Sequence, residues 1–218
     1  MNKEIRNMFC RLLGEDRVLT DEPMSRHTTF HVGGPADYYL LPSDSGQLAM
    51  ILKLCREAQL PCFILGNGSN LLVSDRGFRG VVIQLFRNRN EIRVDGNRLC
   101  VQSGALLSRV AHRAMEEGLT GFEFAGGIPG TVGGAVVMNA GAYGGELKDV
   151  LREVTVMTQE GEILTLPVEQ LEMGYRTSAI KSRNDIVLDA VIELTPGDPE
   201  AICARMKELA EQRTSKQP

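Results

Sequence analysis

The chain has 218 residues and a formal net charge of −4, and 24% of its residues are charged, so it can bury one large core or two small ones. The absence of a long basic block argues against nucleic acid as a partner, and no apolar run is long enough for a membrane span. The five cysteines form no C-x-x-C pair, which favours reduced, mostly buried thiols. The N-terminal segment has no signal-peptide core, so we expect a cytoplasmic protein.

The first half of the chain has the pattern of a βαβ unit. The expected elements are a helix over 3–13 closed by Gly14, a polar stretch to 29, a strand over 36–41, a helix starting near 44, and strands over 62–65 and 81–85. Gln47 follows Asp44 by three residues, as a capping partner would. The apolar face of that helix would consist of Leu48, Ile51, Leu52, Cys55 and Ala58. Strand, helix and strand in this order predict at least partly parallel pairing.

The second half has the pattern of antiparallel strands with helices. The expected elements are a hairpin of 91–94 and 99–103 around Asp95-Gly96-Asn97, a helix over 106–117, a hairpin of 154–158 and 163–166, and a strand over 186–194. The apolar stripe of the helix would consist of Leu107, Val110, Ala111 and Ala114. We therefore expect two lobes, with a boundary near residue 85.

The most unusual stretch runs from Gly121 to Gly145 and holds nine of the chain's 23 glycines. It carries no charge after Glu123, and its interleaved apolar residues exclude a flexible linker. One interpretation is a folded core loop without a ligand. The other is a phosphate cradle of backbone N–H groups, to which a helix over 131–138 would add the positive end of its dipole. In that case a bulky residue at Gly130 or Gly133 would exclude the phosphate, because the gap left by a missing Cβ is used.

A second glycine loop, Gly66-Asn67-Gly68-Ser69-Asn70, directly follows the strand over 62–65. It begins like a Rossmann fingerprint, but Leu71 stands where the third glycine belongs and no acidic residue follows at the spacing that holds a ribose. A P-loop is excluded because neither loop ends in Gly-Lys-Ser/Thr. Alone, the loop could be a plain turn, whereas the two loops together could clasp the pyrophosphate of a dinucleotide.

A metal site is not indicated. His27 and His31 are four residues apart, but no third ligand has suitable spacing, which is typical of two ordinary histidines.

Three segments together resemble one known family. They are GNGSNLLVSDRGFRGVVI (66–83), GFEFAGGIPGTVGGAVVMNAGAYGGELKDVL (121–151) and YRTSAIK (175–181). They are similar to UDP-N-acetylenolpyruvoylglucosamine reductases, and the resemblance extends from about Thr28 to about Asp198. It implies an α+β, two-lobed FAD-binding fold of the vanillyl-alcohol oxidase (PCMH) type. The short distance from Lys181 to Ile186 is similar to the shorter family type, which lacks a substrate-covering insertion there.

The resemblance also implies the reaction. NADPH reduces FAD, and the reduced flavin passes hydride to the enolpyruvyl double bond, which gives UDP-N-acetylmuramate for peptidoglycan synthesis. The implied partners are therefore two small molecules that the protein binds, NADPH and the UDP-sugar enolpyruvyl ether. We expect the protein to be a monomer in the cytoplasm.

Site residues follow from the resemblance position by position. The implied FAD contacts are Gly66, Asn67, Gly68, Ser69, Asn70, Gly126, Gly127, Ile128, Pro129, Gly130, Val132, Gly133, Gly134, Asn139, Ala140, Gly141 and Val187. The implied substrate contacts are Tyr175, Arg176 and Lys181, with Arg176 as the catalytic arginine. A permanently charged guanidinium can hold a carboxylate and the enolate charge that hydride addition creates. Without the surrounding motif, Arg176 would read as a surface arginine in a loop.

The expected organisation is a lead-in over 1–27, FAD-binding lobes over 28–85 and 86–197, and the start of a substrate-binding domain over 198–218. In the family that domain carries a serine proton donor and a late glutamate. Here we expect one helix over 200–211, with an apolar stripe of Ile202, Met206, Leu209 and Ala210. We therefore expect the chain to bind flavin without completing the reaction. Two alternatives stay open: a non-catalytic flavin-binding module, and another flavin oxidase of this fold, although residues 66–70 offer no His or Cys for covalent attachment.

Overall fold

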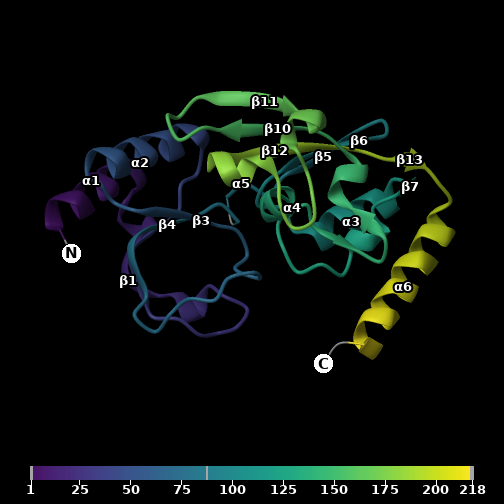
Figure 1. Ribbon diagram of the computed structural model, residues 1–218, viewed down its shortest axis with the longest axis horizontal. Coiled ribbons are helices and arrows are strands. Elements are labelled where there is room, and N and C mark those ends of the chain that lie inside the picture. Colours follow the sequence, from purple (N-terminus) through teal and green to yellow (C-terminus); the bar gives the residue numbers. More distant parts are fainter. Residues whose placement is uncertain (1, 87, 217–218) are drawn as a thin grey trace.

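The structure is a computed structural model that describes residues 2–86 and 88–216. Two sheets with helices packed against them lie side by side along the long axis of the molecule, and the helix α6 runs down one end (Figure 1). This arrangement confirms the α+β class, with a parallel βαβ unit in the first sheet and antiparallel pairing in the second.

The first sheet has the strand order β1-β2-β4-β3. Its strands are β1 (Val18–Pro23), β2 (Pro35–Leu40), β3 (Cys62–Leu65) and β4 (Phe78–Gln84). Strands β2 and β3 both pair with β4 in parallel, so the predicted βαβ unit is confirmed, with β4 inserted between its two strands. The sequence did not predict β1, which lies in the stretch interpreted as polar. This edge strand buries only Val18, so it lacks an alternating apolar pattern.

Helices α1 (Lys3–Leu13) and α2 (Ser45–Glu57) cover one face of this sheet. The N–H of Gln47 donates to Asp44 Oδ1 (2.8 Å), and the Gln47 side chain accepts from the N–H of Ser43, which confirms the predicted start of α2. Four of the five expected apolar residues of α2 are buried. The assignment of Ala58 to this face was wrong: it lies beyond the last turn as the C-cap and is exposed.

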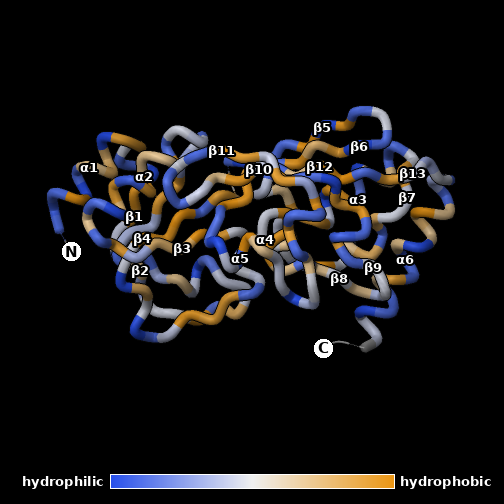
Figure 2. The backbone as a smooth tube through the Cα atoms, turned by 45° about the horizontal axis from the view of Figure 1, so that its top comes forward, coloured by the Kyte–Doolittle hydropathy of each residue, from blue (hydrophilic) through white to orange (hydrophobic). Residues whose placement is uncertain are grey.

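The second sheet has the strand order β11-β10-β12-β6-β5 and is antiparallel throughout. Its strands are β5 (Ile92–Asp95), β6 (Arg98–Gln102), β10 (Leu151–Met157), β11 (Ile163–Pro167) and β12 (Ile186–Glu193). Both predicted hairpins are confirmed. Helices α3 (Leu107–Glu116) and α4 (Val132–Met138) lie against one face, and all four residues of the predicted α3 stripe are buried. Figure 2 shows hydrophobic segments along β3 and β4 and a hydrophilic tip between β5 and β6.

The remaining elements are short, except for α6. The strand pairs are β7 (Leu119–Thr120) with β13 (Thr195–Pro196) and β8 (Gly141–Ala142) with β9 (Gly145–Glu146), and the short helix is α5 (Ala179–Arg183). The 3-10 turns are η1 (Glu15–Arg17), η2 (Met24–Arg26), η3 (Glu123–Ala125), η4 (Leu147–Asp149) and η5 (Val168–Leu171). The sequence predicted none of these strand pairs, because two-residue strands have no periodicity to detect.

Helix α6 (Pro199–Lys216) packs on the second lobe, against α3 and η3. Ile202 and Leu209 are buried and Met206 is half-buried, as the predicted stripe requires, but Ala210 is exposed and does not belong to it. None of the helices in residues 2–86 and 88–216 is long and apolar enough to cross a membrane.

The two lobes share a core. Met157, Ile186 and Leu188 from β10 and β12 of the second sheet pack with residues of α1, α2, β2 and β4. Strand β12 therefore contributes Ile186 and Leu188 to the core of the first lobe, and Val187, Ala190 and Ile192 to the core of the second. All five cysteines are free, but the expectation of mostly buried thiols was wrong, since only Cys55 is buried and the other four are half-buried.

Candidate cofactor and substrate site

The loop over 66–70 begins where β3 ends, at the carboxyl end of the parallel strands. Gly68 has φ +67°, and a Cβ there would overlap the carbonyl oxygen of His27, so this position requires glycine. The N–H of Thr29 donates to the Gly68 carbonyl (3.2 Å), which fixes the loop against the segment before β2.

The structure brings the two glycine loops into contact. A Cβ at Gly66 would lie 2.5 Å from Thr131 Oγ1, and one at Gly130 would lie 3.5 Å from Ser69 Oγ. The loop of the first lobe therefore lies directly against the start of α4 in the second lobe. The two loops are thus adjacent, as a shared phosphate cradle would require.

Backbone donors are available in this contact region. Within the described residues, none of the N–H groups of 67–70, nor that of Gly130, donates to another backbone atom. Unpaired N–H groups in a tight, uncharged loop are the groups that bind an anion.

The helix dipole contributes less than the sequence indicated. Helix α4 has only seven residues, and its first two N–H groups are already used: Val132 donates to the Ala105 carbonyl (2.9 Å) and Gly133 to the Ser103 carbonyl (2.8 Å). The expected contribution of this helix start to an anion site is therefore reduced, because these two N–H groups are not free. The anion donors come mainly from the loops.

Glycines of the second loop serve different purposes. A Cβ at Gly133 would lie 2.9 Å from Ser103 Cβ, so Gly133 lets α4 pack on its own lobe. By contrast, a Cβ at Gly130 would have only Ser69 Oγ within 4 Å among the described residues, at 3.5 Å. The interpretation of Gly133 as part of the open cradle is therefore replaced, whereas Gly130 keeps it.

Helix α6 adds a cation that the sequence did not reveal. A Cβ at Gly126 would lie 3.2 Å from Met206 Cε, and one at Gly127 would lie 3.2 Å from Arg213 Cδ and 3.5 Å from an Arg213 guanidinium nitrogen. Within the described chain, no ion pair forms at Arg213. The glycine loop itself is uncharged, so Arg213 is the positive side chain against it.

Among residues 2–86 and 88–216, two buried polar atoms at the base of the loops have no hydrogen-bond partner. The first is Oε1 of Gln84. Gln84 pairs in the sheet with Leu65, the residue that immediately precedes Gly66. Ser103 Oγ belongs to the residue whose carbonyl accepts from Gly133. Buried polar groups normally have partners, so these two indicate a ligand or water beside the cradle.

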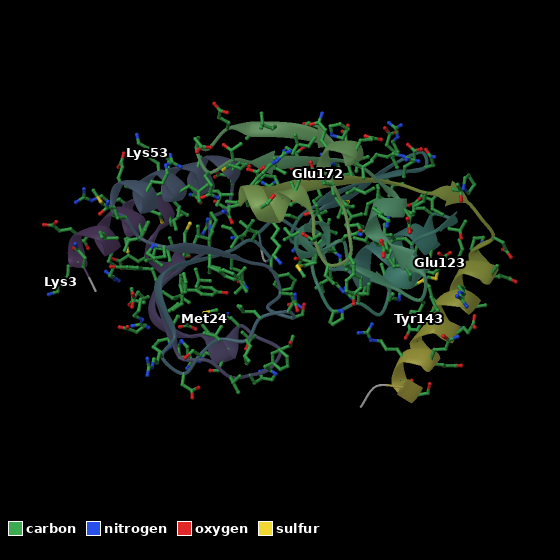
Figure 3. All side chains as sticks on the ribbon, in the orientation of Figure 1. Lys3, Met24, Lys53, Glu123, Tyr143 and Glu172 are labelled. Carbon is green, nitrogen blue, oxygen red and sulfur yellow. The ribbon has the colours of Figure 1, made fainter. Side chains whose placement is uncertain are left out.

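A hollow of about 380 Å³ lies at the other end of α4. Its lining residues are Asn139, Gly141, Ala142, Tyr143, Gly144, Gly145, Glu146, Lys148, Asp149, Tyr175 and Arg176, and we call it the Arg176 pocket. Tyr143 is labelled in Figure 3. Seven helical residues separate the pocket from the glycine loop, or roughly 10 Å at 1.5 Å per residue.

Arg176 lies at the tip of a tight turn. The N–H of Gly174 donates to the Thr177 carbonyl and the N–H of Thr177 to the Gly174 carbonyl, at 3.1 and 3.3 Å, so Tyr175 and Arg176 are the two tip residues. Arg176 has φ +57°, which is rare for a residue with a side chain. Its guanidinium carbon lies 5.7 Å from the centre of the Tyr175 ring, and Tyr175 is 85% exposed.

The electrostatics of the pocket centre on Glu146. Its carboxylate pairs with Lys148 Nζ (2.7 Å) and accepts from Asn139 Nδ2 (3.0 Å). These contacts, with Lys148 first and Asn139 second, hold the pKa of Glu146 below its ordinary value, and the charge of Arg176 adds to the effect. Glu146 in turn raises the pKa of Lys148.

Some predicted residues lie elsewhere. Val187 and Ala140 are buried in the core of the second lobe, and Lys181 is exposed on α5 and does not line the pocket. The side-chain oxygen and nitrogen of Asn139 are both bonded within the protein.

The sequence reasoning missed the charged half of the pocket, Glu146, Lys148 and Asp149, together with Tyr143 and Arg213. All of these except Arg213 lie within the motif over 121–151, so the motif could have indicated them. Nothing in the sequence links Arg213 to Gly127.

No metal site is evident. Within residues 2–86 and 88–216, no three His, Cys, Asp or Glu side chains come together as a metal would require. His27 stacks on Tyr39 with ring centres 4.1 Å apart and bonds to Glu22 (2.9 Å), whereas His31 is exposed.

Fold and site together define an FAD-binding domain, and known proteins agree. The family described as "FAD binding domain" matches residues 36–167. p-Cresol methylhydroxylase, at 18% identity and a TM-score of 0.68 over 90% of this chain and 44% of its own, shares the fold.

Full-length relatives specify the family. The reductase named UDP-N-acetylenolpyruvoylglucosamine reductase from Alkaliphilus metalliredigens is 47% identical over 100% of this chain and 72% of its own length. That of Geobacillus thermodenitrificans is 52% identical over 99% and 71%. The crystal structure of the Thermus caldophilus reductase superposes with a TM-score of 0.76 at 34% identity, over 92% and 70%. The chain belongs to the UDP-N-acetylenolpyruvoylglucosamine reductase family, as its motifs predicted.

Proposed function

We propose that this chain holds FAD non-covalently between the loops over 66–70 and 126–134. We further propose that it presents Arg176 to the substrate during NADPH-linked reduction of UDP-N-acetylglucosamine enolpyruvate to UDP-N-acetylmuramate. The observation that carries the proposal is the contact of the two loops across the lobes, at Gly66 with Thr131 and Gly130 with Ser69. A single-lobe turn or a ligand-free core loop would not need it.

The loops fit a pyrophosphate. The free N–H groups of 67–70 and of Gly130 would donate to phosphate oxygens, and Arg213 would supply positive charge beside Gly127. When bound, FAD supplies the hydride that the reaction needs.

Arg176 would hold the reacting end of the substrate. Its fixed guanidinium can pair with the enolpyruvyl carboxylate and stabilise the enolate charge that develops during hydride addition. The turn presents this charge to the pocket without waiting for a side chain to reorganise. The proton that completes the reaction must come from another group, because the hydroxyl of the nearby Ser178 is buried and donates to the Val137 carbonyl (3.0 Å).

The rest of the proposal concerns partners. NADPH and the UDP-sugar would be the small-molecule partners of a monomeric, cytoplasmic protein. Lys181 would reach the substrate only through movement of α5 or of the substrate, since it does not line the pocket. The lobe boundaries at residues 28, 85 and 197 also remain proposals, and the shared core at Met157 and Leu188 supports a rigid joint between the lobes.

The experiment is a titration of the oxidised, FAD-loaded chain with UDP-N-acetylglucosamine enolpyruvate, followed by the flavin absorbance. The variant is Arg176→Lys, and the matched control is Arg183→Lys, an arginine on α5 outside the pocket. We expect a saturable spectral change in wild type and control. In Arg176→Lys the affinity should fall about tenfold or more, because lysine keeps the charge but not the bidentate fork.

Two outcomes would overturn the proposal. Equal affinity in Arg176→Lys and wild type would remove Arg176 from the substrate site. Flavin binding without any spectral response to the sugar nucleotide would instead favour the non-catalytic flavin module.

A further inference from the structure

Four residues with side chains adopt the left-handed backbone conformation at or beside the Arg176 pocket. They are Asn139 (φ 41°), Tyr143 (53°), Glu172 (46°) and Arg176 (57°). Such conformations are costly and persist only where surrounding contacts enforce them. The contacts that hold the Arg176 turn in place should therefore be identifiable.

Asn139 makes the central contacts. It is buried, with 3% of its surface exposed, and forms the left-handed C-cap of α4. Its Nδ2 donates to Glu146 Oε2 (3.0 Å) and to the Gly174 carbonyl (3.1 Å), and its Oδ1 accepts from the N–H of Lys148 (3.0 Å). Both donors of the amide and one acceptor are thus used inside the protein.

These bonds join three segments. Gly174 begins the Arg176 turn, Glu146 belongs to β9, and Lys148 lies in η4. On the other side of the turn, Ser178 Oγ donates to the Val137 carbonyl (3.0 Å). The last turn of α4 therefore holds the Arg176 turn at both of its ends.

We infer that Asn139 is a positioning residue: its amide fixes the Arg176 turn, and hence the Arg176 guanidinium, relative to the helix that starts at the cofactor loop. Its matched position in the family motif had suggested a contact with the cofactor, but its side-chain bonds serve the turn instead. The inference rests on the proposed function only in the role given to Arg176.

The test uses a reporter at the turn itself. The chain contains no tryptophan, so Tyr175→Trp places a single exposed indole beside Arg176. In this background, Asn139→Gly keeps the left-handed backbone and removes all three side-chain bonds. The matched control is Asn184→Gly, also a left-handed helix C-cap, with φ 56°, at the end of α5.

The readouts are the fluorescence anisotropy of the introduced indole and hydrogen exchange of the peptide over 172–178. We expect Asn139→Gly to lower the anisotropy and to speed exchange of the Gly174 and Thr177 amides roughly tenfold. Asn184→Gly should change neither. Equal values in the two glycine variants would overturn the inference.

A second set of variants covers the case in which Asn139→Gly does not fold. Asn139→Asp keeps the acceptor for Lys148 but loses both donors and places a carboxylate against Glu146, so it should loosen the turn. Adding Glu146→Gln restores a donor opposite the new carboxylate but not the bond to the Gly174 carbonyl, so the melting temperature should recover while the anisotropy stays low. A merely global loss of stability would be reversed together with the anisotropy, and recovery of both in the double variant would contradict the inference. The measurements need neither flavin nor substrate, so failure of FAD binding would count against the proposed function alone.

Discussion

Individual glycines of the glycine-rich stretch differ in what an added Cβ would meet. The density of glycine and the absence of charge predicted a cradle for phosphate. They could not distinguish Gly133, which packs on Ser103, from Gly130, which faces Ser69. The distinction depends on which segment of the folded chain lies against each glycine. It is a tertiary property with no local pattern.

Glu146 provides a test of the pocket's electrostatics at the residue scale. Lys148 first and then Asn139 stabilise its ionised form and lower its pKa. For a lowered carboxylate pKa, the stabilisation is complete above the unfolded-state pKa and is lost as the pH falls through the folded-state pKa. Arg176 also faces this carboxylate, and Asp149 accepts from the backbone N–H of Glu146 (2.9 Å).

We therefore expect wild type to unfold at a higher temperature than Glu146→Gln from pH 6 to 8. The difference should shrink below about pH 4, where glutamate carboxylates become protonated. Thermal unfolding across this range is the measurement. A difference that grows in acid would contradict the assigned contacts.

Residue positions in the two motifs over 121–151 and 175–181 were easier to predict than residue roles. Arg176 and Tyr175 line a pocket, whereas the Asn139 side chain is bonded within the protein and Lys181 lies outside the pocket. The spacing of residues in the sequence places a residue on an element. It does not show whether the side chain of that residue is already hydrogen-bonded to a neighbouring segment.

At the scale of elements, helices and long strands were predictable because their periodicity is local. Helix α1 and the stripe of α3 were predicted correctly, and both hairpins formed. Strand β1 was not predicted, because pairing along β2 rather than its own polar sequence makes it a strand. The same limit applies to the strand pairs β7-β13 and β8-β9.

Helix α6 has the clearest functional consequence among the elements. It places Arg213 against Gly127, from which we expect a screened electrostatic contribution to FAD binding. Arg213→Gln should weaken FAD about tenfold at low ionic strength and less in high salt, and it should leave the fold intact.

The matched control for this prediction is Arg205→Gln, an arginine on the same helix that pairs with Glu208 at the surface (2.6 Å). FAD titrations at two salt concentrations measure both variants. A loss in Arg213→Gln that matches the control, or one that is independent of salt, would remove Arg213 from the cofactor site.

At the scale of the molecule, the proposed site draws on both lobes. The first lobe provides the loop over 66–70, the second provides the loop over 126–134 and the Arg176 turn, and β12 joins their cores. The two-lobed organisation was predictable from the change in strand pattern near residue 85. The shared core at Met157, Ile186 and Leu188 was not, since it depends on how the two sheets pack.

The most direct test of this account is the amount of flavin that acid releases from the purified chain and from Gly130→Val. A valine at 130 has room within its own lobe but projects toward the loop over 66–70, so the variant should fold with an unchanged melting temperature and lose FAD. Gly133→Val is the contrasting control, because its side chain meets Ser103 and should lower the melting temperature. The account predicts close to one FAD per wild-type chain and little in Gly130→Val. Equal flavin in both, or none in wild type reconstituted with FAD, would contradict a cofactor held between the two lobes.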